Sequence, residues 1–168
     1  MPSQTTTYAV APPWTTTQWF NTPAPLSLPS LRGRVVVLHA FQMLCPGCVQ
    51  HGLPQAQRVA DTFPPGEVAV VGVHTVFEHH DAMPPHALKA FLHEYRITFP
   101  VGVDAPGDDG PLPQTMGAYA MRGTPTLLLI DRAGRIRRHA FGQIPDMELG
   151  AQIMGLVGEP VPNEAPGA

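Results

Sequence analysis

Residues 35–48, VVVLHAFQMLCPGC, place an apolar run just before a closely spaced cysteine pair. The run Val35–Phe41 is rich in β-branched side chains, which is typical of a central strand buried on both faces. Cys45 and Cys48 are the only cysteines in the 168 residues, and a stretch with helical periodicity follows them. Two thiols separated by two residues can close a small disulfide ring and open it again. This strand, Cys-x-x-Cys and helix arrangement predicts a redox centre.

Helices and strands alternate along the rest of the chain. We expect helices at residues 46–62, 85–95, 112–121 and 146–157, and strands at 35–41, 68–73, 99–103, 126–130 and 135–141. Pro54 removes a backbone donor inside the first helix and should kink it. Asp146 is a candidate cap for the last helix. The order β-α-β-α-β-α-β-β-α predicts an α/β protein, with a central mixed sheet covered on both sides and an antiparallel hairpin at one edge.

The length of 168 residues suits one domain with a sizeable core. We predict an extension at residues 1–30, a domain at residues 31–158 and a flexible tail at residues 159–168. Trp14 and Trp19 are expected to anchor the extension on the domain rather than to bind a ligand.

The composition limits the classes of binding partner and the cellular location that we expect. The net charge of −3 gives no electrostatic case for nucleic acid or an anionic membrane. No apolar run is long enough to span a bilayer. No basic residue precedes Arg32 and no apolar segment of signal-peptide length is present, so we expect a cytoplasmic protein. Nothing in the sequence calls for a cofactor.

The spacing of the cysteines assigns each a role. Cys45 would sit at the helix N-terminus, where the helix dipole favours its thiolate and exposure lets it attack first. Cys48, one turn inward, would be more buried and would resolve the mixed disulfide. Pro46 suits the first helical turn, and Gly47 keeps the surface over the sulfur low for an approaching polypeptide. The expected partners are protein thiols or disulfides and a dithiol electron donor.

Two metal-binding alternatives remain open at this point. His39 and His51 could complete a Cys₂His₂ zinc site with the cysteine pair. A second cluster of potential ligands follows the strand at residues 68–73, although polar residues on such a loop are usually solvated. Its members are His74, Glu78, His79, His80 and Asp81, with His86 and His93 nearby.

Three sequence blocks resemble the thioredoxin-like superfamily. They are LRGRVVVLHAF at residues 31–41, CPGC at residues 45–48 and RGTPTLLLID at residues 122–131. The chain is most similar to the redoxin branch, with its TlpA-like thiol-disulfide oxidoreductases and peroxiredoxin relatives, over about residues 20–157. The resemblance implies a thioredoxin fold. It also implies that Thr124 and Pro125 form a cis-proline segment that faces the disulfide and pairs with the backbone of a substrate.

The chain departs from the family pattern at three positions near the cysteines. Leu44 stands where the family usually has Trp, and His39 and His51 stand where acids are common. A cationic imidazole lowers a nearby thiol pKa, whereas a buried carboxylate raises it. We therefore hypothesise that His39 or His51 shifts Cys45 toward the thiolate, the alternative being that His39 is simply a hydrogen-bonded core residue.

A peroxiredoxin-like thiol peroxidase is the alternative activity. That family needs a Pro seven residues before its peroxidatic cysteine and a Thr or Ser three residues before it. Leu38 and Gln42 occupy those positions here. Because the hydroxyl that would orient the peroxide is absent, thiol-disulfide exchange is the preferred prediction.

Overall fold

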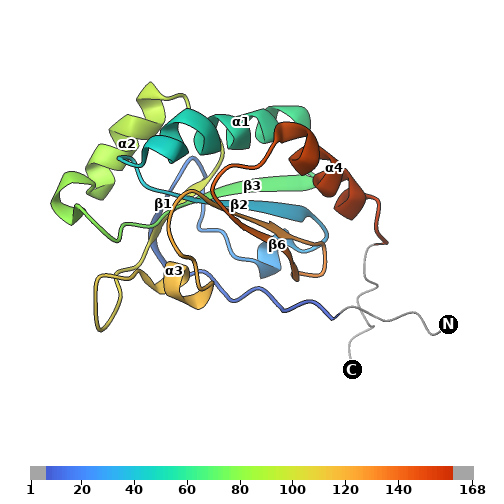
Figure 1. Cartoon of the computed structure of the whole chain (residues 1–168), viewed down its shortest axis with the longest axis horizontal. Coiled ribbons are helices and arrows are strands. Elements are labelled where there is room, and N and C mark those ends of the chain that lie inside the picture. The colour runs from blue at the N-terminus through green and yellow to red at the C-terminus, as the bar shows by residue number, and fades with distance from the viewer. Residues whose placement is uncertain (1–6, 161–168) are drawn as a thin grey trace.

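The computed structural model describes residues 7–160, which form one six-stranded mixed sheet covered by helices on both faces (Figure 1). Residues 1–6 of the predicted extension and residues 161–168 of the predicted tail lie outside the described residues. The strand order is β1-β4-β3-β2-β5-β6. The strands are β1 (Thr16–Phe20), β2 (Val35–Phe41), β3 (Val68–His74), β4 (Val101–Asp104), β5 (Thr126–Ile130) and β6 (Ile136–Phe141).

The predicted central strand is confirmed. All seven residues of β2 are buried, and the strand pairs in parallel with β3 and antiparallel with β5. β5 continues antiparallel into β6, so the predicted hairpin forms one edge of the sheet. β2 therefore ends in the middle of the sheet, and the cysteines follow directly from that end.

Alternate side chains of β2 enter two separate cores. Val35, Val37 and Phe41 pack beneath α1 (Leu53–Thr62), α2 (Pro85–Glu94) and α4 (Asp146–Val157), which lie above the sheet in Figure 1. Val36, Leu38 and Ala40 face the other layer. That layer contains α3 (Gln114–Ala118), the 3-10 turn Pro29–Leu31 and the N-terminal segment.

The predicted helix at residues 46–62 forms, but it changes geometry near its start. Residues 48–52 are a π-helical segment, Cys48–Gly52, and regular α-helix resumes in α1. Pro54 follows this segment inside the continuous helix, where it offers no N–H to the preceding turn. The wider π turn thus begins at Cys48 and ends two residues before the proline that we expected to disturb the helix.

Strand β1 was not predicted from the sequence. It pairs antiparallel with β4 and closes the sheet edge opposite β6. Its sequence, TTQWF, is largely polar and only partly buried, so it lacks the apolar run of an interior strand. Trp14 and Trp19 pack against the lower core, as expected of anchors, with their ring centroids 5.9 Å apart.

Two helix predictions need correction. α3 has only five residues, because Tyr119 ends it and Ala120 adopts a left-handed conformation with φ 49°. Asp146 does not cap α4; Pro145 holds that position, and Asp146 instead accepts hydrogen bonds from Gln55 and Arg58. Among the described residues, no helix combines the length and the apolar character needed to cross a bilayer.

Candidate active site

The cysteine pair lies where the end of β2 turns into the helix. Cys45 and Cys48 form a disulfide in the structure. Cys45 is half-buried and can be reached from solvent, whereas Cys48 is fully buried in the upper core. This difference agrees with the predicted order of reaction, in which the accessible sulfur reacts with a partner first.

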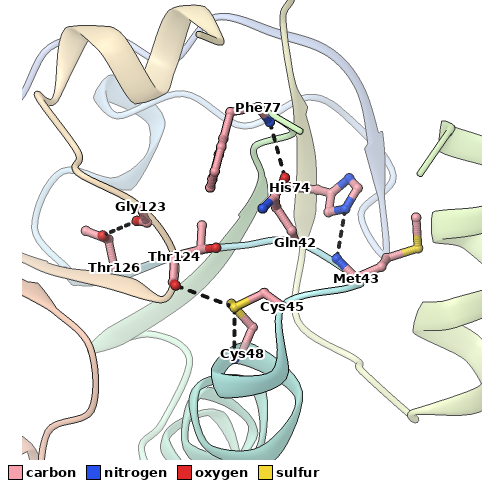
Figure 2. Close-up of a disulfide and its surroundings, with 9 residues drawn as sticks. All are labelled: Gln42, Met43, Cys45, Cys48, His74, Phe77, Gly123, Thr124 and Thr126. Carbon is pink, nitrogen blue, oxygen red and sulfur yellow. Dashed lines mark hydrogen bonds between the residues drawn. A yellow bond between two sulfur atoms is a disulfide. The ribbon is translucent and has the colours of Figure 1, made fainter. Parts of the chain in front are cut away.

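Two backbone groups contact the Cys45 sulfur. The N–H of Cys48 donates to Sγ at 3.2 Å, and the carbonyl oxygen of Thr124 lies 3.5 Å from the same sulfur (Figure 2). An N–H that points at the sulfur favours its anionic form after reduction, and the N-terminal end of the helix dipole acts in the same direction. Both effects therefore favour a thiolate at Cys45 when the pair is reduced.

The turn before Cys45 is attached to the end of β3. The backbone N–H of Met43 donates to Nε2 of His74 at 3.2 Å, and the side-chain carbonyl of Gln42 accepts from the N–H of Phe77 at 3.2 Å (Figure 2). Burial lowers the pKa of His74 to about 4, so its ring is neutral at neutral pH and the unprotonated Nε2 can accept this hydrogen bond. His74 was predicted to belong to a polar loop cluster, but it lies in the core, beside Phe41.

His39 lies in the sheet directly below the π-helical segment. A Cβ on Gly52 would overlap the His39 ring and lie 3.3 Å from Cβ of Pro125, so these three residues meet under the disulfide. Neither ring nitrogen of His39 has a hydrogen-bond partner among the described residues. Burial lowers the pKa of His39 to about 4, and the ring is therefore neutral at neutral pH.

This neutral ring corrects part of our electrostatic hypothesis. A cation at His39 was expected to favour the Cys45 thiolate, but burial removes that charge. His39 is a core residue, as the alternative expected, and its ring nitrogens contact no hydrogen-bonding group of the described residues. His51 lies exposed on the π-helical segment, so the two histidines occupy opposite environments.

The segment before β5 forms the other wall of the site. The Thr124–Pro125 peptide bond is cis. The segment is fixed by two hydrogen bonds: Thr126 Oγ1 donates to the Gly123 carbonyl at 2.7 Å, and the Gly142 N–H donates to the Pro125 carbonyl at 2.8 Å. A Cβ on Gly47 would lie 3.3 Å from Cδ of Pro125. Gly47 thus allows the helix start to pack closely against this wall.

The predicted metal ligands do not assemble. Across residues 7–160, no three His, Cys, Asp or Glu side chains come close enough together to hold a metal ion. His74 is committed to the Met43 N–H, while its predicted companions on the loop are exposed: Glu78, His79, His80 and Asp81. Within the same residues, His39 and His51 do not form such a group with Cys45 and Cys48.

A cysteine pair at the start of a helix, packed against the segment before β5 on a mixed sheet flanked by helices, defines a protein of the thioredoxin-like class. Comparison with known proteins gives the particular family. The chain belongs to the AhpC/TSA family, which it matches over residues 9–139.

Solved structures support the same assignment. The crystal structure of a thioredoxin-like superfamily protein is 61% identical with a TM-score of 0.90, covering 92% of this chain and 99% of that one. A thiol-disulfide isomerase from Corynebacterium glutamicum is 48% identical with a TM-score of 0.85, covering 89% and 98%. The chain thus has a thioredoxin-like fold of the redoxin branch.

Curated relatives match only in part. Protein DipZ of Mycobacterium bovis and of Mycobacterium tuberculosis is 30% identical over 129 residues, which is 76% of this chain and 17% of DipZ. The chain therefore spans about a sixth of the length of these relatives.

Proposed function

We propose that the protein exchanges disulfides with protein substrates through Cys45 and Cys48. The observation that carries this proposal is the difference between the two cysteines. The Cys45 sulfur is accessible and accepts a hydrogen bond from the Cys48 N–H, whereas Cys48, its disulfide partner, is fully buried. The similarity to a thiol-disulfide isomerase supports the same reaction class. The segment at Thr124 and Pro125 lies against the sulfur, where the backbone of a substrate could pair with it.

The exchange proceeds in two displacements. In the dithiol form, the Cys45 thiolate attacks one sulfur of the substrate disulfide; that bond breaks, and the leaving thiolate takes up a proton. The Cys48 thiol then loses its proton and attacks Cys45 Sγ, which expels the second substrate thiolate. The substrate leaves with two thiols, and the Cys45–Cys48 disulfide is restored to the dithiol by two electrons and two protons from a dithiol donor.

The direction of this cycle depends on the compartment. A cytoplasmic location, expected from the sequence, is part of the proposal. There the pair rests as a dithiol and reduces other proteins. Among the supporting residues, Pro46 and Gly47 shape the helix start, and His39 and Pro125 enclose Gly52 below it. His51 is exposed on the π-helical segment.

The experiment is a trapping assay with a disulfide-bonded peptide of known sequence. Cys48→Ser should accumulate a mixed disulfide between Cys45 and the peptide, seen as a mass adduct that dithiothreitol removes. Cys45→Ser is the matched control and should give no adduct, because the remaining sulfur is buried. An adduct on Cys48 in that control, or none in Cys48→Ser, would refute the assigned roles.

Rapid consumption of hydrogen peroxide would instead favour the peroxidase alternative. The Gln42 side chain stands where that chemistry needs a hydroxyl, and its carbonyl is engaged by Phe77. The reduced protein is therefore expected to consume hydrogen peroxide no faster than a free thiol of similar pKa.

A further inference from the structure

An exposed aromatic ring lies beside the wall of the active site. Phe141, the last residue of β6, is 51% exposed. Its ring packs on Gly123, where a Cβ would lie only 3.0 Å from Phe141 Cε2. Arg122 is also exposed, and the centre of its guanidinium lies 5.7 Å from the centroid of the Phe141 ring. A cation over an aromatic face is held in place by the ring quadrupole.

This pair of residues lies next to the reactive sulfur. Arg122 and Gly123 directly precede Thr124, whose carbonyl oxygen lies 3.5 Å from Cys45 Sγ. On the cysteine side of the same contact, Leu44 directly precedes Cys45 and is 57% exposed. Leu44 thus flanks the reactive sulfur from the helix side, and the Arg122–Phe141 pair lies beside the Thr124 segment that contacts it.

Within residues 7–160, the Arg122 guanidinium has no carboxylate partner. Among the described residues, the arginines that form ion pairs are Arg58, Arg137 and Arg138, and no carboxylate lies within 4.0 Å of Arg122. An unpaired cation at the rim of a binding surface attracts partners of opposite charge and repels like charge.

We propose that Leu44, Arg122 and Phe141 form a recognition surface for protein disulfides that have an apolar and an acidic residue next to the substrate cysteine. The inference rests on the proposed disulfide exchange and names its substrate class. The apolar residue packs on Phe141 or Leu44, and the carboxylate pairs with the Arg122 guanidinium. Because the ion pair is exposed, its effect on the rate is modest, about two- to fivefold, and falls with added salt.

The test compares three disulfide peptides that differ only beside one cysteine: Leu-Asp, Leu-Ser and Leu-Lys. The protein, kept reduced by dithiothreitol, should reduce the Leu-Asp peptide about two- to fivefold faster than the Leu-Lys peptide at low salt. Arg122→Glu should reverse this order. Phe141→Ser should slow all three peptides, and being an exposed substitution it should leave the fold intact.

Two controls separate recognition from chemistry. Arg135→Glu makes the same charge change at the opposite end of β6, six residues or about 20 Å from Phe141, and should preserve the wild-type order. The neutral disulfide 2-hydroxyethyl disulfide has no apolar or acidic neighbour to recognise, so its rate with Arg122→Glu relative to the wild type measures any change in Cys45 reactivity, and each peptide rate is divided by it.

The outcomes distinguish the two levels of inference. Equal rates for the acidic and basic peptides, or a preference that Arg122→Glu leaves unchanged, would overturn the recognition surface while the proposed exchange stands. Failure to reduce any disulfide, 2-hydroxyethyl disulfide included, would overturn the exchange and the surface that depends on it.

Discussion

At position 52, one hydrogen atom in place of a methyl group lets the helix lie on the sheet. Gly52 has ordinary helical angles, so its need for glycine is steric rather than conformational. The His39 ring fills the space that a Cβ would occupy, and Pro125 closes the other side. This packing fixes the height of the helix above the sheet and, with it, the position of the two sulfurs.

Gly52→Ala should destabilise the protein by about 1–3 kcal/mol, because the added methyl group must displace a buried ring. His39→Ala in the same chain removes the obstacle and should recover much of the loss. A double-mutant cycle from urea unfolding measures this coupling. The control is Gly150→Ala in α4, where a Cβ meets nothing within 4 Å and added helix propensity should stabilise slightly. Additive effects of Gly52→Ala and His39→Ala would contradict the packing argument.

The charge states of the buried histidines could not be predicted from the sequence. The residues CPGC indicate the pair and its order of reaction, because both depend on local position in a helix. The charge state of His39 depends on burial by β3, β5 and the helix above, which belong to distant segments. The contact between His74 and Met43 likewise joins residues 31 positions apart and follows no motif.

At the scale of elements, α3 depends on a single carboxylate. A five-residue helix has too few internal hydrogen bonds to be stable alone. Asp104, at the end of β4, accepts from the N–H of Thr115 at 2.8 Å and of Met116 at 3.0 Å. Burial raises the pKa of the Asp104 carboxyl, and these N–H bonds oppose that rise.

Asp104→Ala should lower the free energy of unfolding by about 2–4 kcal/mol, because two buried donors lose their acceptor. Asp104→Asn keeps one carbonyl oxygen and should lose about half as much. Urea midpoints with an unchanged m-value give the comparison. Asp81→Ala, an exposed substitution on the loop after β3, should change stability by less than about 0.5 kcal/mol. An equally small effect at Asp104 would show that α3 does not need this contact.

Elements with strong apolar patterns were predictable, and the others were not. β2, β3 and β5 are buried runs, and the helix from residue 46 has a clear apolar face. β1 is half-exposed and gains its partner from β4, some 80 residues later, so TTQWF carries no local signal for it. Asp146 precedes an apolar helix as a cap would, but a tertiary partner, Arg58, takes its carboxylate instead.

For the whole molecule, two buried neutral histidines make stability depend on pH. In the unfolded chain a histidine has a pKa near 6.5, whereas burial lowers the pKa of both His39 and His74 to about 4. Between these values the unfolded chain binds more protons, so stability falls as the pH drops from about 6.5 to about 4.

Each histidine should contribute a slope approaching about 1.4 kcal/mol per pH unit in that window, and little above it. Urea unfolding from pH 4 to pH 8 measures the slope. His39→Leu and His74→Gln should each remove about half of the histidine contribution. Asp104, whose pKa is raised, acts in the opposite direction at the acid end, so the comparison among variants isolates the histidines. A slope that survives both substitutions would assign the acid sensitivity to other groups.

The strand order also determines whether tryptophan fluorescence can report the redox state of the cysteine pair. Both tryptophans lie at the β1 edge, and β4 and β3 separate that edge from β2, a distance of about 14 Å. Because Leu44 rather than Trp precedes Cys45, no indole contacts the disulfide, and the disulfide therefore cannot quench tryptophan emission by contact. Tryptophan emission should therefore stay constant when the disulfide is reduced and change when the sheet unfolds. Fluorescence would then report stability free of interference from the redox state, and the redox state would have to be followed by counting thiols.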